Sequence, residues 1–344
     1  PFHQVIGRKP LQSLPWYFNL CRQRIRENGS EHSAFSPTGA AGFHVPLKFA
    51  RFYEGPSSDE RSHTFDVDET VTDFLIEFTA ATRLKKSRKY GEALAAFVAL
   101  ADYEKATSLQ QSRALAEAAA CAQSSGNDEQ AMELAGRIPL EAIAKTAQME
   151  VLSGQRNWEA IIERFGDEDF ASWPFTEIGA AAFARGRAWF GAQVGDKADA
   201  DLQLALEFTS DSRTQMSLLN SIARNRETVL KDEDLALEAY RAICASTTNT
   251  GSSDYYYGIQ GAARILTRRQ EFDEALKILD KVDVANLRGT WAGSMLLARA
   301  ATSQAAGRTD EALETYRAVL THQSATKGQK NAAEETIEAL GKRQ

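Results

Sequence analysis

The chain has 344 residues, a formal net charge of −7 at pH 7, 43% hydrophobic residues and 25% charged residues, values typical of a globular protein. This composition excludes a disordered or fibrous chain, and the negative charge disfavours nucleic-acid binding, because that affinity depends on basic side chains that neutralise phosphates. The length suffices for about two domains with a substantial core.

No segment of the sequence predicts a membrane span, since the longest apolar run, residues 114–122, contains a glutamate and is too short to cross a bilayer. Cys21, Cys121 and Cys244 are far apart, so we expect each to be a small buried side chain outside any disulfide or zinc site. Because the chain begins at Pro1 without a methionine, we expect a longer precursor, and the start indicates no cellular location.

Aromatic and β-branched runs near the start predict β-strands: LPWYFNLCRQR (14–24), FSPTGAAGFHVP (35–46) and KFARFYE (48–54). So few strands cannot form a sandwich core, and alone they leave backbone groups unpaired. We therefore expect this segment to be completed by missing sequence, by the first helices of the downstream domain or by a second chain. Its exposed strand edges predict a homodimer.

Residues in this segment resemble the end of family 9 carbohydrate-binding modules and their DOMON-like relatives. The matching residues, in order, are Trp16, Phe18, Asn19, Arg22, Phe35, Ser36, Pro37, Phe43, His44, Pro46, Phe49 and the closing RFYE. Phe35 and Ala50 depart from the tryptophan and glycine that members commonly have. The resemblance covers the last third of such a β-sandwich and implies sugar binding, with Trp16 and Arg22 as candidates, and an exported (periplasmic or secreted) bacterial protein. Alternatively, Trp16 belongs to a core and Arg22 braces a strand.

A polar stretch without periodicity, residues 54–69, contains Gly55 and Pro56 and indicates a linker. We predict three parts: the C-terminal strands of an incomplete β-sandwich in 1–55, a linker in 56–67, and a helical repeat domain in 68–344.

The downstream part is rich in alanine and repeats a helix–turn–helix pattern. The alanine that opens each second helix recurs at spacings of 29 to 40 residues, at Ala93, Ala131, Ala160, Ala200, Ala236, Ala275 and Ala312. Large residues that follow it are expected to fill the space between hairpins, at Phe97, Leu204, Tyr240, Leu279 and Tyr316.

Five of the seven residues that stand twelve positions before these anchors are alanine, and Gln148 and Arg224 are the exceptions. A small side chain at this position allows two antiparallel helices to cross closely. The five alanines are Ala81, Ala119, Ala188, Ala263 and Ala300.

These features resemble tetratricopeptide repeats, which have small residues in the first helix, a tight turn, and an alanine followed by an aromatic residue in the second. The resemblance implies an all-α, α–α superhelical solenoid of about seven hairpins over residues 68–322, with KNAAEETIEALGKR (330–343) as a polar capping helix. The turn glycine of the family is present at Gly126, Gly195 and Gly307. The units that contain Gln148 and Arg224 fit a related helical-hairpin solenoid equally well.

Catalytic motifs are absent from the sequence: there is no phosphate-binding loop, dinucleotide-binding fingerprint, HExxH or GxSxG. We therefore predict no enzymatic activity and no cofactor. A metal site from His32 and His44 would lack a third ligand at a suitable spacing, so we predict no metal site. The other histidines are scattered, at His3, His63 and His322.

In the tetratricopeptide family, the first helix of each unit lines a concave groove. Assigning position 20 of the family repeat to the alanine of the second helix places basic and aromatic residues in this groove, although the whole chain is acidic. This pattern favours an acidic peptide or protein partner, held by charge-assisted hydrogen bonds and aromatic anchors. Alternatively, these are ordinary solvated positions, with Trp189 partly packed. The nine candidates are Lys85, Lys145, Arg185, Trp189, Asn225, Tyr257, Gln260, Arg264 and Arg268.

The sequence therefore predicts a non-catalytic protein-interaction scaffold. Two alternatives remain open: a carbohydrate-binding protein in which the repeats are a spacer, and an accessory subunit of a glycan-processing enzyme. We expect no nucleic-acid partner and no membrane span.

Overall fold

The computed structural model describes residues 69–287 and 289–342. The chain divides into two units, Pro1–Phe65 and Asp66–Gln344, and the described residues all belong to the second. The predicted β-strands, linker, Cys21 and the carbohydrate candidates Trp16 and Arg22 lie outside the described residues, so these predictions and the predicted domain limits stay predictions.

The described residues form fifteen α-helices and two short 3-10 helices, without a strand among them. The helices are α2 (Glu69–Lys86), α3 (Tyr90–Ala101), α4 (Ser108–Ser124), α5 (Asp128–Gly136), α6 (Glu141–Gly154), α7 (Trp158–Phe165), η4 (Phe170–Ser172), α8 (Phe175–Gly191), α9 (Gly195–Glu207), α10 (Ser212–Thr228), α11 (Glu233–Cys244), α12 (Ser253–Arg268), α13 (Phe272–Leu279), η5 (Val284–Asn286), α14 (Trp291–Ala305), α15 (Thr309–Thr321) and α16 (Lys327–Gly341).

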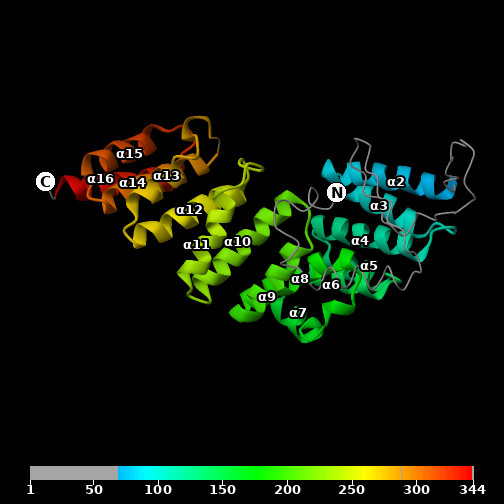
Figure 1. The fold of residues 1–344 in the computed structure, drawn as a ribbon. Coiled ribbons are helices and arrows are strands. Elements are labelled where there is room, and N and C mark those ends of the chain that lie inside the picture. The colour runs from blue at the N-terminus through cyan, green and yellow to red at the C-terminus, as the bar shows by residue number, and fades with distance from the viewer. Residues whose placement is uncertain (1–68, 288, 343–344) are drawn as a thin grey trace, which may run out of the picture. The chain divides into compact units, whose positions relative to one another are not determined.

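Consecutive α-helices pair into hairpins, from α2 with α3 to α14 with α15 (Figure 1). We call the first helix of each hairpin the A helix and the second the B helix. Each A helix packs on its own B helix, and each B helix packs on the next A helix. Consecutive A helices also contact each other, closely for α4 with α6 and α6 with α8, but sparsely for α8 with α10. The predicted all-α array of hairpins is confirmed for the described residues, with α16 packed on α14 and α15 at its end.

All seven turns between A and B helices share one backbone feature, a left-handed residue with φ between 57° and 79°. In six of them, this residue and the next donate the two hydrogen bonds of a Schellman motif. Gly126, for example, donates to the Gln123 carbonyl at 2.9 Å, and Asn127 donates to the Ala122 carbonyl at 3.0 Å. The left-handed residues are Arg88, Gly126, Arg156, Gln193, Lys231, Gln270 and Gly307.

The turn between α8 and α9 corrects one prediction. Its left-handed residue is Gln193, whereas Gly195, the turn glycine that the family resemblance implies, is the first residue of α9. A Cβ atom at Gly195 would lie 2.6 Å from Cδ2 of Leu230, so this glycine allows close packing instead of the turn.

A buried anchor lies four residues after the N-cap of every B helix, and all seven anchors are fully buried. The predictions at Ala160 and Ala200 are wrong: Ala160 is half-buried, Ala200 is exposed, and Ile161 and Ala198 take these places. The residue four positions after each anchor is also buried, whatever its size. In α9 this residue is Leu202, in place of the predicted Leu204. The observed anchors are Ala93, Ala131, Ile161, Ala198, Ala236, Ala275 and Ala312.

The residue where each A helix crosses its B helix, which we call the crossing residue, is buried in every hairpin. Neither Gln148 nor Arg224 is such a residue, because Met149 and Ala223 are buried in their place. The turn after α10 contains one residue more than the other turns, and in this turn the Leu230 amide donates to the Asn225 carbonyl at 3.0 Å. The crossing residue of α10 therefore lies thirteen residues before the anchor instead of twelve. The set is Ala81, Ala119, Met149, Gly186, Ala223, Ala263 and Ala300.

Apolar side chains between the helices form three buried clusters along the domain. The buried members of these clusters fall within residues 74–151, 149–295 and 300–340. Cys121 and Cys244 are buried, as predicted, and no disulfide joins these two cysteines. Burial raises the pKa of the Cys244 thiol to about 11. Tyr255 and Tyr256 are buried as well, and the Tyr256 ring lies 5.3 Å, centroid to centroid, from that of Trp291 in α14.

Candidate functional site

The structure buries three of the nine predicted groove residues. Arg185 forms a two-pronged ion pair with Asp201, with Nε–Oδ2 at 2.7 Å and Nη2–Oδ1 at 2.8 Å. Its Nη1 also donates to the Glu168 carbonyl at 2.6 Å, and the guanidinium lies 3.9 Å from the centre of the Phe170 ring. Arg185 therefore joins α8 to α9 and to the segment before α8, and its donors are already used inside the protein.

Trp189 and Asn225 are also out of reach of a partner. Trp189 is 7% exposed, and its ring faces the Lys197 ammonium at 4.3 Å from the ring centre. Asn225 is fully buried and donates from Nδ2 to the Gly195 carbonyl at 2.9 Å, which ties α10 to the start of α9. Together with Arg185, these residues stabilise the junction between hairpins.

Four predicted cations form ion pairs within the domain. Lys85 pairs with Glu117 of α4 at 2.7 Å, and Lys145 pairs with Glu168 at 2.6 Å and with Glu141. On α12, both arginines approach the same carboxylate of α10, that of Glu227. The Arg264 and Arg268 distances to it are 2.6 and 3.0 Å.

The remaining two candidates, Tyr257 and Gln260, lie one turn apart on α12. Tyr257 is 55% exposed, and its ring meets that of Trp291 edge to face at a centroid distance of 4.7 Å. Gln260 is half-buried. This part of α12 therefore presents an aromatic surface to solvent beside the paired Arg264.

A corrected repeat register reveals a ladder of arginines that the sequence analysis missed. The residue directly after the crossing residue is arginine in three consecutive A helices: Arg187 in α8, Arg224 in α10 and Arg264 in α12. All three are exposed. In α6 the equivalent residue is Glu150, so the sign of the charge changes between α6 and α8.

Arg187 and Arg224 differ from the paired cations, because aromatic rings are their neighbours. The Arg187 guanidinium lies 5.4 Å from the Trp158 ring centre and 5.8 Å from that of Phe183, and the Arg224 guanidinium lies 5.5 Å from that of Phe190. Such contacts contribute about 0.5–1 kcal/mol at exposed sites and hold the charged group in place. Among the described residues, neither arginine has a carboxylate partner.

We call these five residues, Arg187, Arg224, Trp158, Phe183 and Phe190, the arginine strip. Although the Arg187 side chain is exposed to solvent overall, partial desolvation of its guanidinium, with a smaller contribution from the nearby positive charge of Arg156, lowers the pKa of Arg187. A guanidinium nevertheless stays protonated at neutral pH. The strip therefore presents fixed positive charges and planar apolar groups, which suit the carboxylates or phosphates of a partner.

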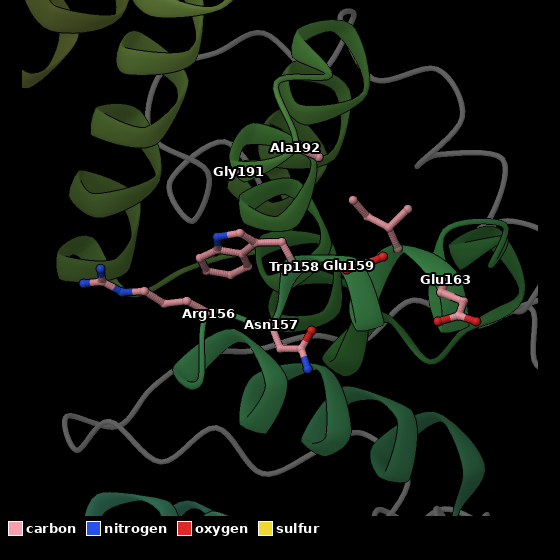
Figure 2. Close-up of a pocket in the computed structure, with 8 residues that line it drawn as sticks. Arg156, Asn157, Trp158, Glu159, Glu163, Gly191 and Ala192 are labelled. Atoms are coloured by element: carbon pink, nitrogen blue, oxygen red, sulfur yellow. The ribbon is translucent and has the colours of Figure 1, made fainter.

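A shallow, open depression adjoins the strip at Trp158 (Figure 2). The indole ring lies directly over Gly191, where a Cβ atom would come within 2.4 Å of its Cδ1, so only glycine leaves room for it. Arg156 and Glu163 lie on opposite sides of Trp158 (Figure 2), which gives the depression a basic end and an acidic end. Its lining residues are Arg156, Asn157, Trp158, Glu159, Ile162, Glu163, Gly191 and Ala192.

The described residues contain no group of histidine, cysteine, aspartate or glutamate side chains arranged to hold a metal ion. In the same part of the chain, no helix combines the length and apolarity that a membrane span requires. His322 accepts a hydrogen bond from the Ser324 amide at 3.2 Å, and the other four histidines lie outside the described residues.

No family model and no curated protein sequence matches the chain. A solved structure, the TPR domain of P58(IPK), aligns with 79% of this chain and 99% of its own length, at 14% sequence identity and a TM-score of 0.21. A TM-score this low does not establish a shared fold, so the assignment of helical hairpins rests on the helices and turns described above. The comparisons support neither the predicted carbohydrate-module resemblance nor a bacterial, exported protein.

Proposed function

We propose that the protein is a non-catalytic, tetratricopeptide-like scaffold, and that the arginine strip binds an acidic segment of a protein partner. The observation that carries the proposal is the pair Arg187 and Arg224. Both are exposed and held against aromatic rings, and neither has a carboxylate partner among the described residues, in a chain with a net charge of −7.

The repeat geometry indicates how such a segment would be spaced. Closely packed helices lie about 8–10 Å apart, and an extended peptide advances about 3.3 Å per residue. Because α8 and α10 contact each other only sparsely, acidic side chains three or more residues apart in an extended partner would meet successive arginines. Tyr257 and Gln260 continue the proposed surface on α12, where Tyr257 supplies an exposed aromatic anchor.

The four predicted groove cations that form ion pairs within the domain are expected to contribute less to binding. Arg264 contacts a partner only in competition with Glu227, and Arg268 only in competition with Glu227 and Glu233. Lys85 and Lys145 compete in the same way with Glu117 and Glu168. We expect them to add to the attraction of the groove, with less effect on affinity than Arg187 and Arg224. Binding at exposed charges weakens as salt shortens the screening length, which is about 10 Å at 0.1 M.

Fluorescence anisotropy with a dye-labelled twelve-residue peptide, with glutamate at every third position, tests the proposal. We expect this peptide to bind more tightly than its glutamine counterpart, and more tightly at 25 mM than at 150 mM NaCl. Replacing both Arg187 and Arg224 with glutamate is expected to lower the affinity about tenfold or more. Each exposed ion pair contributes up to about 1 kcal/mol, and the reversal adds repulsion.

Arg317→Glu is the matched control, because Arg317 is an exposed arginine on α15 without an ion pair among the described residues. This variant changes the net charge but leaves the strip intact, so we expect less than a twofold effect. Equal losses for strip and control variants would reduce the effect to net charge, and the proposal would fail.

A further inference from the structure

The position after the crossing residue, which is arginine in α8, α10 and α12, is glutamate in α6. Glu150 directly follows the crossing residue of α6, as Arg187 follows that of α8, so the two side chains extend from the same face of successive A helices. The Glu150 side chain is exposed, and its carboxylate forms no hydrogen bond or ion pair with another described residue. Glu150 is therefore an unpaired negative charge at the end of a row of arginines.

Two cations lie close enough to Glu150 to favour its ionised form, but other carboxylates already neutralise both of them. Lys85 of α2 pairs with Glu117 of α4 at 2.7 Å. Arg113 of α4 pairs with Glu177 of α8, whose side chain is almost fully buried. The charges of Glu117 and Glu177 also oppose the ionisation of Glu150. Of these five charged groups, Glu150 is the one left for a cation from a partner.

The part of α4 beside Glu150 is small and apolar. The two helices contact each other closely, and Gln123 at the end of α4 donates to the Val151 carbonyl of α6 at 2.7 Å. Ala120 holds the position in α4 that Glu150 holds in α6, and Ala116 lies one turn before it. Both alanines are half-buried and cannot neutralise a charge. They offer a surface on which the aliphatic stem of a lysine or arginine can lie while its charged end reaches the carboxylate.

We propose that Glu150 binds a lysine or arginine side chain of the partner, next to the acidic segment that the arginine strip holds. This inference rests on the proposed function and adds a basic residue to the sequence that the groove recognises. Because α6 and α8 contact each other closely, their equivalent residues lie about 8–10 Å apart, or about three residues of an extended peptide. A basic residue about three positions from the nearest acidic one would therefore reach Glu150 while the acidic one meets Arg187.

The ionisation of Glu150 gives this contact a pH dependence. Although the side chain is exposed overall, desolvation of the carboxyl group is the main cause that raises its pKa to about 7. Glu117 and Glu177 raise this pKa as well, whereas Lys85 and Arg113 lower it. Glu150 is therefore mostly ionised at pH 8 and mostly protonated at pH 6. Since a cation pairs with the ionised form, the contribution of the basic residue should grow between these two pH values.

Three dye-labelled, acetylated peptides test this inference with the full chain, by fluorescence anisotropy at pH 8. They share a block with aspartate at every third position. One has lysine three residues before the block, the second has lysine three residues after it, and the third has alanine at both places. An extended segment lies in the groove in one direction, so we expect one of the two lysine peptides to bind at least threefold more tightly than the alanine peptide. A gain in neither would overturn the inference. Equal gains in both would also overturn it, because they would reflect attraction to the net negative charge of the chain.

Glu150→Gln is expected to reduce the gain from lysine to less than 1.5-fold. Glu133→Gln is the matched control, since Glu133 is an exposed glutamate of α5 without an ion pair among the described residues, and it should keep the full gain. In the unmodified protein, the gain should fall below twofold at pH 6. A gain that persists in Glu150→Gln, or that is the same at pH 6 and pH 8, would assign the lysine to another site and overturn the inference.

The two proposals fail in different ways. If the three peptides bind equally and the double Arg187→Glu, Arg224→Glu variant loses them all, the basic-residue site is wrong and the acidic-segment scaffold stands. If no acidic peptide binds at all, both are wrong.

Discussion

Two regions of this domain present cations from equivalent helices, yet they use them differently. In the region of α2, α4 and α6, Lys85 pairs with Glu117, Arg113 pairs with Glu177 and Lys145 pairs with Glu168, so a carboxylate of a neighbouring element neutralises each of these three cations. On α8 and α10, Arg187 and Arg224 face aromatic rings instead. The same repeat can therefore produce an internal ion-pair network or an exposed surface of cations beside aromatic rings, depending on which residues the neighbouring helix supplies.

The contrast is sharpest within α8, where Arg185 and Arg187 are two residues apart. A helix turns by about 100° per residue, so two positions move a side chain to the opposite side. Arg185 points into the junction, where Asp201 neutralises it, and Arg187 reaches solvent. Residue type alone does not distinguish an arginine that is paired inside the junction from one that is exposed to solvent.

The largest effect that we expect comes from Arg185→Met. This change leaves Asp201 buried without its partner, and breaking a buried ion pair in this way typically lowers the free energy of unfolding by about 3–5 kcal/mol. Urea denaturation followed by circular dichroism measures the loss. Arg187→Met, two residues away, is the control and should lower stability by about 1 kcal/mol at most, through the loss of its exposed contacts with aromatic rings.

Adding Asp201→Leu to Arg185→Met should restore part of the lost stability, because an apolar pair needs no neutralisation. Equal destabilisation by the Arg185 and Arg187 variants, or no recovery in the double variant, would remove the distinction between the two arginines.

An intermediate effect is expected where a paired arginine is released. Burial alone would raise the pKa of Glu227, but hydrogen bonds from Arg264, Arg268 and Tyr240 prevail and lower it, so Glu227 holds both arginines at neutral pH. Glu227→Gln should strengthen acidic-peptide binding roughly fivefold, since an added unit charge about 4 Å from a carboxylate contributes about 1 kcal/mol in water. Anisotropy measures the gain, and unchanged affinity would show that pairing does not limit Arg264.

The same carboxylate predicts the sign of a pH effect. Because the pKa of Glu227 is lowered in the folded state, its ion pairs stabilise the fold at pH values above about 4.3, the pKa of glutamate in the unfolded chain. This stability is lost as the pH falls through the pKa of the folded state. In Glu227→Gln this part of the acid dependence should disappear from the unfolding free energy, and its persistence would place the dependence elsewhere.

The smallest effects concern the turns, which share one conformation although their residues differ. Gln270 has φ of 63°, so Gln270→Gly should raise the free energy of unfolding by about 0.5–1 kcal/mol. Gly307→Ala should lower it by a similar amount, since a Cβ there meets nothing within 4 Å and only the backbone conformation opposes it. Thermal unfolding checks both. Opposite signs from those expected would mean that these turns tolerate side chains in this conformation.

The repeat pattern predicted most of the fold because it reflects packing. Ala93, Ala131 and Ala312 mark anchors correctly, since a fully buried position between close helices selects small side chains. The error at Ala160 arose because the anchor of α7 is an isoleucine beside the only alanine of that helix, and the error at Ala200 arose because α9 has a buried and an exposed alanine two residues apart. Ile161 could have been found from the sequence, because it lies four residues after the N-cap Asn157. Ala198 is located by the left-handed φ of Gln193 in the preceding turn, and a backbone angle is not visible in the sequence.

The candidate site was predicted less well, and the reason is the same register. A shift of two residues in the fourth hairpin placed Arg185 and Trp189 in the groove, although the structure buries both, and excluded Arg187, which it exposes. An extra residue in the turn after α10 had the same effect on Asn225 and Arg224.

The sequence by itself determined that residues 69–342 form helical hairpins, because the period of apolar and small residues specifies which face of each helix is buried. Only the tertiary structure decided which cations are free. An ion pair such as Lys85 with Glu117, or Arg264 with Glu227, joins residues 32 or 37 positions apart, and it forms only because two helices bring these side chains together. Local sequence patterns contain no information on such partners, so the arginine strip can be identified only from the tertiary structure.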